Sequence, residues 1–145
     1  MTTIELQEKI AACRRQINAL EARNTEINRF LRETEDGSAS LFEASNKWER
    51  SRSDCYDSVR MSLDKLDSHS TFRDSYLRKI DSILESREAE AISENYHEMK
   101  KEITKSVTDA AEELETNKRR IQQLQQEMMC YNSLIEAEKA QEVTL

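Results

Sequence analysis

Two stretches of this chain, one near each end, repeat apolar residues at alternating steps of three and four positions. The first ladder consists of Leu6, Ile10, Cys13, Ile17, Leu20, Asn24, Ile27 and Leu31. The second ladder consists of Val107, Ala110, Leu114, Asn117, Ile121, Leu124, Met128, Tyr131 and Ile135. Because this spacing places successive side chains on one face of an α-helix, each ladder predicts a long helix that packs against another helix, as in a coiled coil.

Each ladder is interrupted by one asparagine, Asn24 in the first and Asn117 in the second. A buried amide destabilises a helix pair unless it is hydrogen-bonded, so one polar residue in such a ladder favours one register. An antiparallel pairing that places Asn24 opposite Asn117 also brings the other ladder positions against each other. We expect these two residues to form a register-setting polar pair within side-chain hydrogen-bonding distance.

The middle of the chain carries weaker helical stripes. One stripe consists of Leu41, Ala44, Trp48, Cys55, Val59, Leu63 and Leu66, and the next consists of Phe72, Tyr76, Ile80, Leu84, Ala91, Asn95 and Met99. The polar stretch around Gly37, followed by Ser40 as a helix cap, predicts a break between two helices. Residues 72–137 contain no glycine, proline or turn cluster, so we expect one continuous helix there, with a stutter where Ile103 is followed by Val107.

These elements predict helices over about 3–35, 40–67 and 71–137, with a polar reversal at residues 68–71. The expected fold is all-α: an elongated antiparallel helical hairpin or coiled-coil rod, forming a single domain over residues 1–145 with a frayed tail at 138–145. Toward the bend, the expected register pairs Trp48 with Ala91, Cys55 with Leu84, Val59 with Ile80 and Leu63 with Tyr76. A shorter four-helix bundle, with the last helix broken near residues 86–93, is the competing arrangement.

The composition supports long helices and narrows the range of ligands. The 145 residues include no proline, one glycine and 35% charged residues, and the formal net charge is −7. Phosphate contacts dominate nucleic-acid affinity, so this acidic chain is not expected to bind nucleic acid. The sequence shows no signal segment and no apolar run of about 18 residues, so we expect no membrane span. The expected location is the cytoplasm, and export together with a client is the alternative.

Residues that carry catalysis or bind metals are not arranged in any recognised motif. One glycine cannot supply a Gly-rich phosphate loop, and the two histidines lack HExxH or paired C-x-x-C spacing. The three cysteines are an odd number, which fits free thiols better than a disulfide framework. We therefore expect a protein that is not an enzyme and that uses no cofactor or metal.

Most of the remaining large apolar residues lie outside the predicted packing stripes, where a partner protein could contact them. The candidates for partner binding are Phe42, Trp48, Tyr56, Met61, Leu77, Ile83 and Ile92, and Phe30, Met129 and Leu134 are further apolar residues outside the stripes. Trp48 fits either the core or an exposed aromatic anchor. Apolar side chains outside the packing face indicate that another helical surface covers them, from a different protein or from a second copy in a homodimer.

The order of the elements resembles small helical accessory proteins of Gram-positive type VII secretion, in particular the Trp-X-Gly-related partners of Leu-X-Gly toxins. The resemblance rests on the ladder from Leu6 to Leu31, the segment Leu41-Phe42-Glu43-Ala44-Ser45-Asn46-Lys47-Trp48, and Cys55-Tyr56. It implies a non-catalytic adaptor or chaperone that binds the helical targeting domain of a client toxin, with or without a second small helical protein, and promotes its secretion.

Two departures from that family change what the resemblance implies. In Trp48-Glu49-Arg50, arginine stands where the family signature has glycine, and Tyr131 is followed four residues later by Ile135 where the export signal has an acid. The resemblance then implies that a partner supplies the export signal. The alternative function is a structural coiled-coil subunit or homodimeric scaffold of unrelated machinery.

Overall fold

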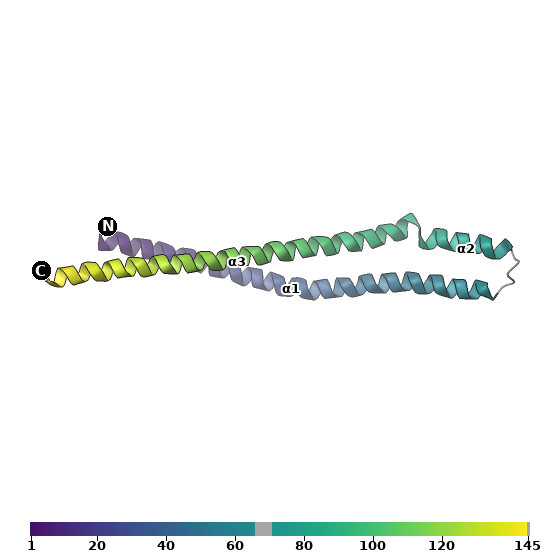
Figure 1. Ribbon diagram of the computed structural model, residues 1–145, viewed down its shortest axis with the longest axis horizontal. Helices are drawn as coiled ribbons and strands as arrows, with labels where there is room; N and C mark the ends of the chain where they lie inside the picture. Colours follow the sequence, from purple (N-terminus) through teal and green to yellow (C-terminus); the bar gives the residue numbers. More distant parts are fainter. Residues whose placement is uncertain (66–70, 145) are drawn as a thin grey trace. The chain divides into compact units, whose positions relative to one another are not determined.

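The computed structural model describes residues 1–65 and 71–144, and nearly all of them are helical (Figure 1). Helix α1 spans Thr3–Asp64, α2 spans Thr71–Leu84 and α3 spans Arg87–Thr144. None of the described residues lies in a strand. The expected all-α helical hairpin is confirmed, whereas the reversal expected at residues 68–71 lies almost entirely outside the described residues.

The chain divides into two compact units. Unit 1 consists of Met1–Glu33 and Val107–Leu145, and unit 2 consists of Thr34–Ser106. Helices α1 and α3 each contribute to both units, and α2 belongs to unit 2. Within each unit, the segment of α1 runs antiparallel to the segment that it packs against (Figure 1).

The core of unit 1 is the pair of apolar ladders. Leu6, Ile10 and Ile135 form one buried cluster, and Met128 and Tyr131 pack against it. The next cluster consists of Cys13, Ile17 and Leu124, with Leu20 and Ile121 packed against it. These are the neighbours that the pairing of the two asparagines predicts.

The two asparagines meet in unit 1. The side-chain amide Nδ2 of Asn117 donates a hydrogen bond to Oδ1 of Asn24 at 3.0 Å, and both residues are half-buried. The predicted contact is therefore confirmed. Its role in selecting the register stays a prediction.

Replacing both Asn24 and Asn117 with leucine is expected to raise the thermal unfolding temperature and to loosen the register or the oligomeric state. Two leucines pack favourably in several registers, whereas the two amides bond in one. The single change Asn117→Leu is the control, because it leaves Asn24 without its donor and is expected to cost about 1–2 kcal/mol. Circular dichroism and light scattering measure these effects, and an unchanged specificity in the double variant would contradict the role.

The break expected between residues 35 and 40 is wrong, because α1 continues through Gly37. Gly37 does not adopt a positive φ, and the Ser40 hydroxyl donates to the carbonyl of Asp36 at 3.3 Å instead of capping a new helix. A glycine in a helix costs roughly 1 kcal/mol relative to alanine. That cost is too small to interrupt a helix whose packing face continues on both sides.

The continuous helix expected over residues 72–137 is also wrong, since Glu85 and Ser86 separate α2 from α3. The Ser86 hydroxyl caps α3 by accepting the backbone N–H of Ala89 at 3.3 Å. A guanidinium nitrogen of Arg52 donates to the carbonyl of Leu84, the last residue of α2, at 2.5 Å. Helix α3 itself extends to Thr144, beyond the end expected at 137.

The packing face of unit 2 follows different residues from those expected. Alternating steps of three and four continue along α1 through Thr34, Ser38, Leu41, Ser45, Trp48 and Arg52, and along α3 through Ser86, Ala89, Ser93, Tyr96, Lys100 and Ile103. The expected stripe residues Ala44, Ala91, Asn95 and Met99 are exposed. Ile103 and Val107 thus belong to one unbroken alternation, and the predicted stutter is wrong.

The pairs expected near the bend are partly wrong for the same reason. Trp48 bonds to Ser93 instead of facing Ala91, and Cys55 and Tyr76 are exposed. After Arg52 the facing positions of α1 shift by one residue, so that Tyr56 is half-buried, followed by Val59 and then the buried Leu63. The shift lies where Arg52 bonds to the end of α2.

Candidate functional site

Hydrogen bonds between polar side chains hold the packing face of unit 2. The indole Nε1 of Trp48 donates to the Ser93 hydroxyl at 3.1 Å, and that hydroxyl donates to Glu49 at 2.7 Å. Arg52, with a side chain 18% exposed, donates to Ser93 and Glu90, each at 3.0 Å. Polar residues thus occupy positions that apolar residues fill in unit 1.

A second polar contact lies farther along the same face. Lys100 donates to the buried hydroxyl of Ser45 at 2.8 Å. The Lys100 ammonium also lies 4.9 Å from the centre of the Phe42 ring, within cation–π distance. Phe42 is therefore partly covered by its own chain, on the flank of the packing face that also carries Glu49 and Glu90.

The opposite flank carries charged pairs in unit 1. Arg23 binds Glu113 through two nitrogens, at 2.7 and 3.1 Å, and Arg120 donates to Gln16 at 3.4 Å. The hydrogen bond from Arg23 lowers the pKa of the Glu113 carboxyl, because it stabilises the ionised form. The flank of unit 1 is thereby bridged by side chains of the chain itself.

The equivalent positions in unit 2 are uncharged. Two heptads beyond Arg23 and Glu113 stand Gly37 and Met99, and three heptads beyond them stand Ala44 and Ile92. We call Gly37, Ala44, Ile92 and Met99 the glycine flank. Ile92 is 38% exposed and Met99 is 42% exposed, and a Cβ atom added to Gly37 would meet nothing within 4 Å. The glycine flank is open on its outer side.

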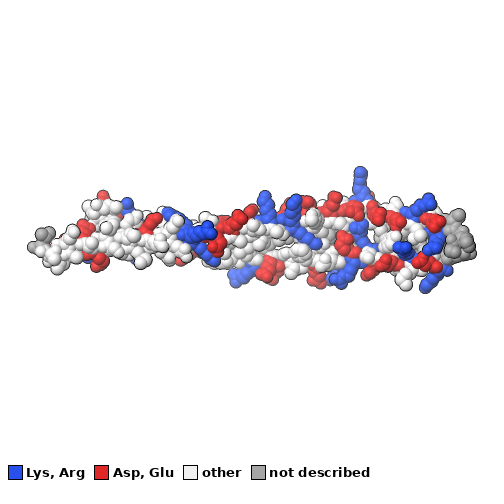
Figure 2. Space-filling model, in the orientation of Figure 1, with Lys and Arg blue, Asp and Glu red and all other residues white. Residues whose placement is uncertain are grey.

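Charged residues border the glycine flank unevenly. The exposed positions three or four residues from the glycine flank are Glu88, Asn95 and Glu102 on α3, and Glu33, Ser40 and Lys47 on α1. Glu33 is paired with Arg29 at 3.2 Å. Lys47 binds Glu43 at 3.2 Å, so its charge is already paired. The edge along α3 is therefore acidic, while charged groups of both signs are spread over the visible face of unit 2 (Figure 2).

The structure does not gather the predicted partner-binding residues into one patch. Trp48, Tyr56 and Leu77 are half-buried in the packing face, Phe42 lies on the flank opposite Ile92, and Met61 and Ile83 are 66% and 67% exposed. The role of these residues in binding stays a prediction.

Sequence reasoning missed three residues of the glycine flank, namely Gly37, Ala44 and Met99. It assigned Ala44 and Met99 to the core stripes and Gly37 to a break. The signal that could have found them is the unbroken alternation of three and four, carried from unit 1 into the middle of each long helix.

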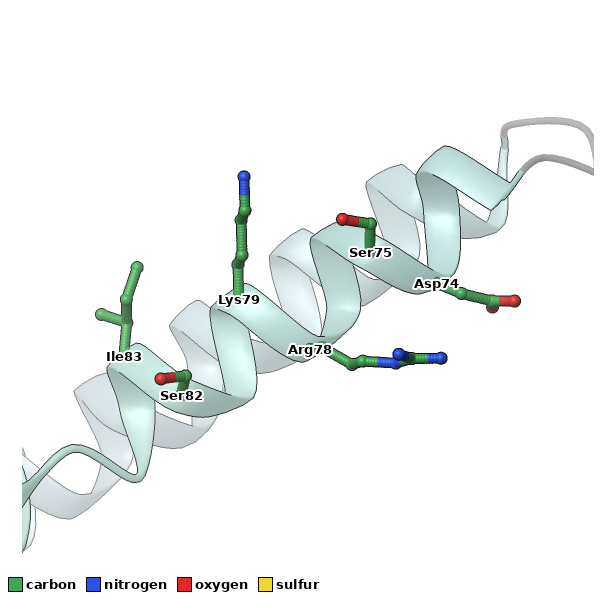
Figure 3. A pocket seen from close by; sticks show the side chains of 6 residues that line it. All are labelled: Asp74, Ser75, Arg78, Lys79, Ser82 and Ile83. Atoms are coloured by element: carbon green, nitrogen blue, oxygen red, sulfur yellow. The ribbon is translucent and has the colours of Figure 1, made fainter.

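A surface hollow along α2 does not form a site. Its lining residues are Asp74, Ser75, Arg78, Lys79, Ser82 and Ile83, all from α2. Figure 3 shows Lys79 and Ile83 projecting to one side of the helix, away from Asp74 and Arg78. Since these groups diverge, they do not converge on a small ligand.

The described residues contain no group of three or more His, Cys, Asp or Glu side chains placed to hold a metal ion. Among the same residues, no helix is both long and apolar enough to cross a membrane. Cys13 is buried, and Cys55 and Cys130 are exposed free thiols. Comparison with known proteins finds no matching family model, curated protein or solved structure.

Proposed function

We propose that this chain is a non-catalytic helical adaptor that binds a helix of a client protein on the glycine flank. The main observation is that Gly37 lies inside a long helix, on the same flank as the exposed side chains of Ile92 and Met99, and that a Cβ atom added to it would meet nothing within 4 Å. Glycine lowers helix stability, and its frequent use is to let another backbone approach closely. An adaptor that receives a client helix at this point gives such a glycine a role.

The other residues of the glycine flank suit the same partner. Met99 has a flexible thioether side chain that adapts to different apolar surfaces, and Ile92 adds a second apolar contact. The acidic edge at Glu88 and Glu102 favours basic side chains on the adjoining side of the client helix. The expected client segment is therefore an amphipathic helix with an apolar stripe and Lys or Arg along one border.

The client class that we favour is the helical targeting domain of a type VII toxin, for which this chain would act as chaperone and targeting factor. The support is the resemblance in the N-terminal ladder and in the segment around Trp48, because the helix break that the resemblance in element order required is absent from α1. A client that covers Ile92 and Met99 would also shield its own apolar face before secretion. The structural-scaffold alternative would not require a neighbouring toxin.

Co-expression with the helical domain of a neighbouring long toxin tests the proposal. The expected result is a complex of defined stoichiometry that survives size-exclusion chromatography with light scattering. Gly37→Leu is expected to abolish that complex while keeping or raising thermal stability, because leucine favours a helix and fills the approach path. This combination separates loss of the surface from loss of the fold.

Met99→Glu, which places a charge on the glycine flank, is expected to weaken the complex. Ile4→Glu is its matched control, since Ile4 is 69% exposed and lies in unit 1, and it is expected to leave the complex intact. If the wild-type chain ignores every neighbouring gene product, the adaptor proposal fails. If Gly37→Leu binds as well as wild type, the proposed surface is wrong.

A further inference from the structure

The outer surface of α3 in unit 1 carries a second ladder, away from the packed face. It consists of Arg119, Gln122, Gln126, Met129, Ser133 and Glu136, all of which are exposed. We call this set the outer ladder. Its steps are three, four, three, four and three residues, so the spacing reads the same in both directions along the helix.

The centre of the outer ladder is uncharged although the chain as a whole is rich in charge. Residues 121–135 contain one charged side chain, Glu127, whereas 35% of the whole chain is charged. Consistent with this, the visible face of unit 1 carries fewer charged atoms than that of unit 2 (Figure 2). Met129 is 68% exposed in the middle of this stretch.

The two ends of the outer ladder carry opposite charges. Arg119 stands at one end and Glu136 at the other, and neither forms an ion pair with any residue that the structure describes. About 25 Å of helix separates them, at 1.5 Å per residue. A helix of this kind is complementary to an antiparallel copy of itself.

We propose that a second copy of this chain binds the outer ladder, forming an antiparallel homodimer about a two-fold axis. The symmetric spacing brings Arg119 against Glu136 of the second copy, Gln122 against Ser133, and Gln126 against Met129. Such an interface is isologous, so each contact occurs twice. Two intermolecular ion pairs then lie at the two ends of an interface whose centre is uncharged.

Charge selects both the partner and the register. Two chains that each carry −7 repel over most of their surfaces, and the outer ladder offers a contact free of that repulsion. A shift by one heptad in one direction places Glu112 against Glu136, two like charges. A shift in the other direction places Arg119 against Val143 and removes both ion pairs.

Cys130 supplies a built-in probe of this interface. Cys130 is exposed and directly follows Met129. The proposed two-fold axis passes between Gln126 and Met129, so Cys130 lies beside the outer ladder and close to this axis. The proposed register therefore brings Cys130 beside Cys130 of the second copy. The other exposed thiol, Cys55, belongs to unit 2 and is distant in sequence from the outer ladder.

Cross-linking with a short bismaleimide, without any client protein, tests the dimer. The Cys55→Ser variant, which keeps Cys130, is expected to give a covalent dimer, and Cys55→Ser with Cys130→Ser is expected to give none. Light scattering over a range of concentrations is expected to show reversible association. A chain that stays monomeric at every concentration would overturn the proposal.

Charge reversal in the Cys55→Ser background tests the register. Arg119→Glu or Glu136→Arg alone is expected to reduce dimer formation about tenfold, because attraction becomes repulsion at both symmetric pairs. The double reversal is expected to restore it. Equal cross-linking in all four proteins would refute the register, while circular dichroism confirms that each variant stays helical. The client-binding experiment with Gly37→Leu is independent of this result, so either proposal can fail alone.

Discussion

Replacing Leu124 with alanine is expected to lower the free energy of unfolding by about 2–4 kcal/mol. Leu124 is 1% exposed and packs with Cys13 and Ile17 in the middle of the unit 1 core. The substitution removes apolar contact area and leaves a cavity that two helices held by a continuous ladder can only partly close. Urea unfolding followed by circular dichroism measures the loss.

Leu134→Ala is the matched control for this experiment. It makes the same chemical change in the same helix, but Leu134 is 52% exposed. The expected loss is below about 1 kcal/mol, since little buried area disappears. Similar losses in both variants would contradict the assignment of Leu124 to the core of unit 1.

Replacing Arg52 with alanine is expected to destabilise unit 2 by about 1–3 kcal/mol. The change removes the donor to the carbonyl of Leu84 and the bonds to Ser93 and Glu90. A cation beside the last carbonyl of a helix also interacts favourably with the helix dipole. Trp48 fluorescence reports the unfolding of this unit directly, because the Trp48 indole bonds to Ser93.

Two further variants separate the role of Arg52 from general effects of charge. Arg50→Ala, at an exposed position of the same helix, is expected to change stability by less than about 0.5 kcal/mol. Arg52→Lys is expected to recover little, because one ammonium cannot reproduce the fork that reaches three acceptors. If Arg52→Ala instead matched Arg50→Ala, the bonds at the helix break would not contribute to stability.

The two units differ in what holds their helices together, which bears on the proposed function. Unit 1 buries leucine, isoleucine and cysteine side chains, whereas unit 2 places Ser45, Arg52, Ser93 and Lys100 on its packing face. Hydrogen bonds contribute less net stability than apolar burial of similar extent, because water competes for them in the unfolded state. The proposed client surface thus lies on the unit whose packing face carries these polar side chains, and the proposed homodimer surface lies on the unit with the apolar ladders.

Within the core of unit 1, the sequence was sufficient. Its ladders are long and regular. In any other register of the two ladders, Asn24 and Asn117 would each face an apolar residue and lack a hydrogen-bonding partner. The contact between Asn24 and Asn117 could thus be predicted from spacing alone. The surface that we propose for the client could not, since Ala44 and Met99 look like core residues until the phase of the helix is known.

The sequence by itself determined that the chain is helical and where the two apolar ladders lie, because helical periodicity is a local property of the residues. The single asparagine in each ladder also predicted the contact between Asn24 and Asn117. Only the tertiary structure decided that α1 continues through Gly37, that α2 ends at Leu84, and that serine, arginine and lysine face inward in unit 2. The end of α2 and the inward polar residues are accompanied by hydrogen bonds between residues far apart in the chain, while the passage through Gly37 follows from a packing face that continues on both sides. Arg52 and Leu84 show the reason, since neither residue alone indicates that their bond accompanies a break in a helix.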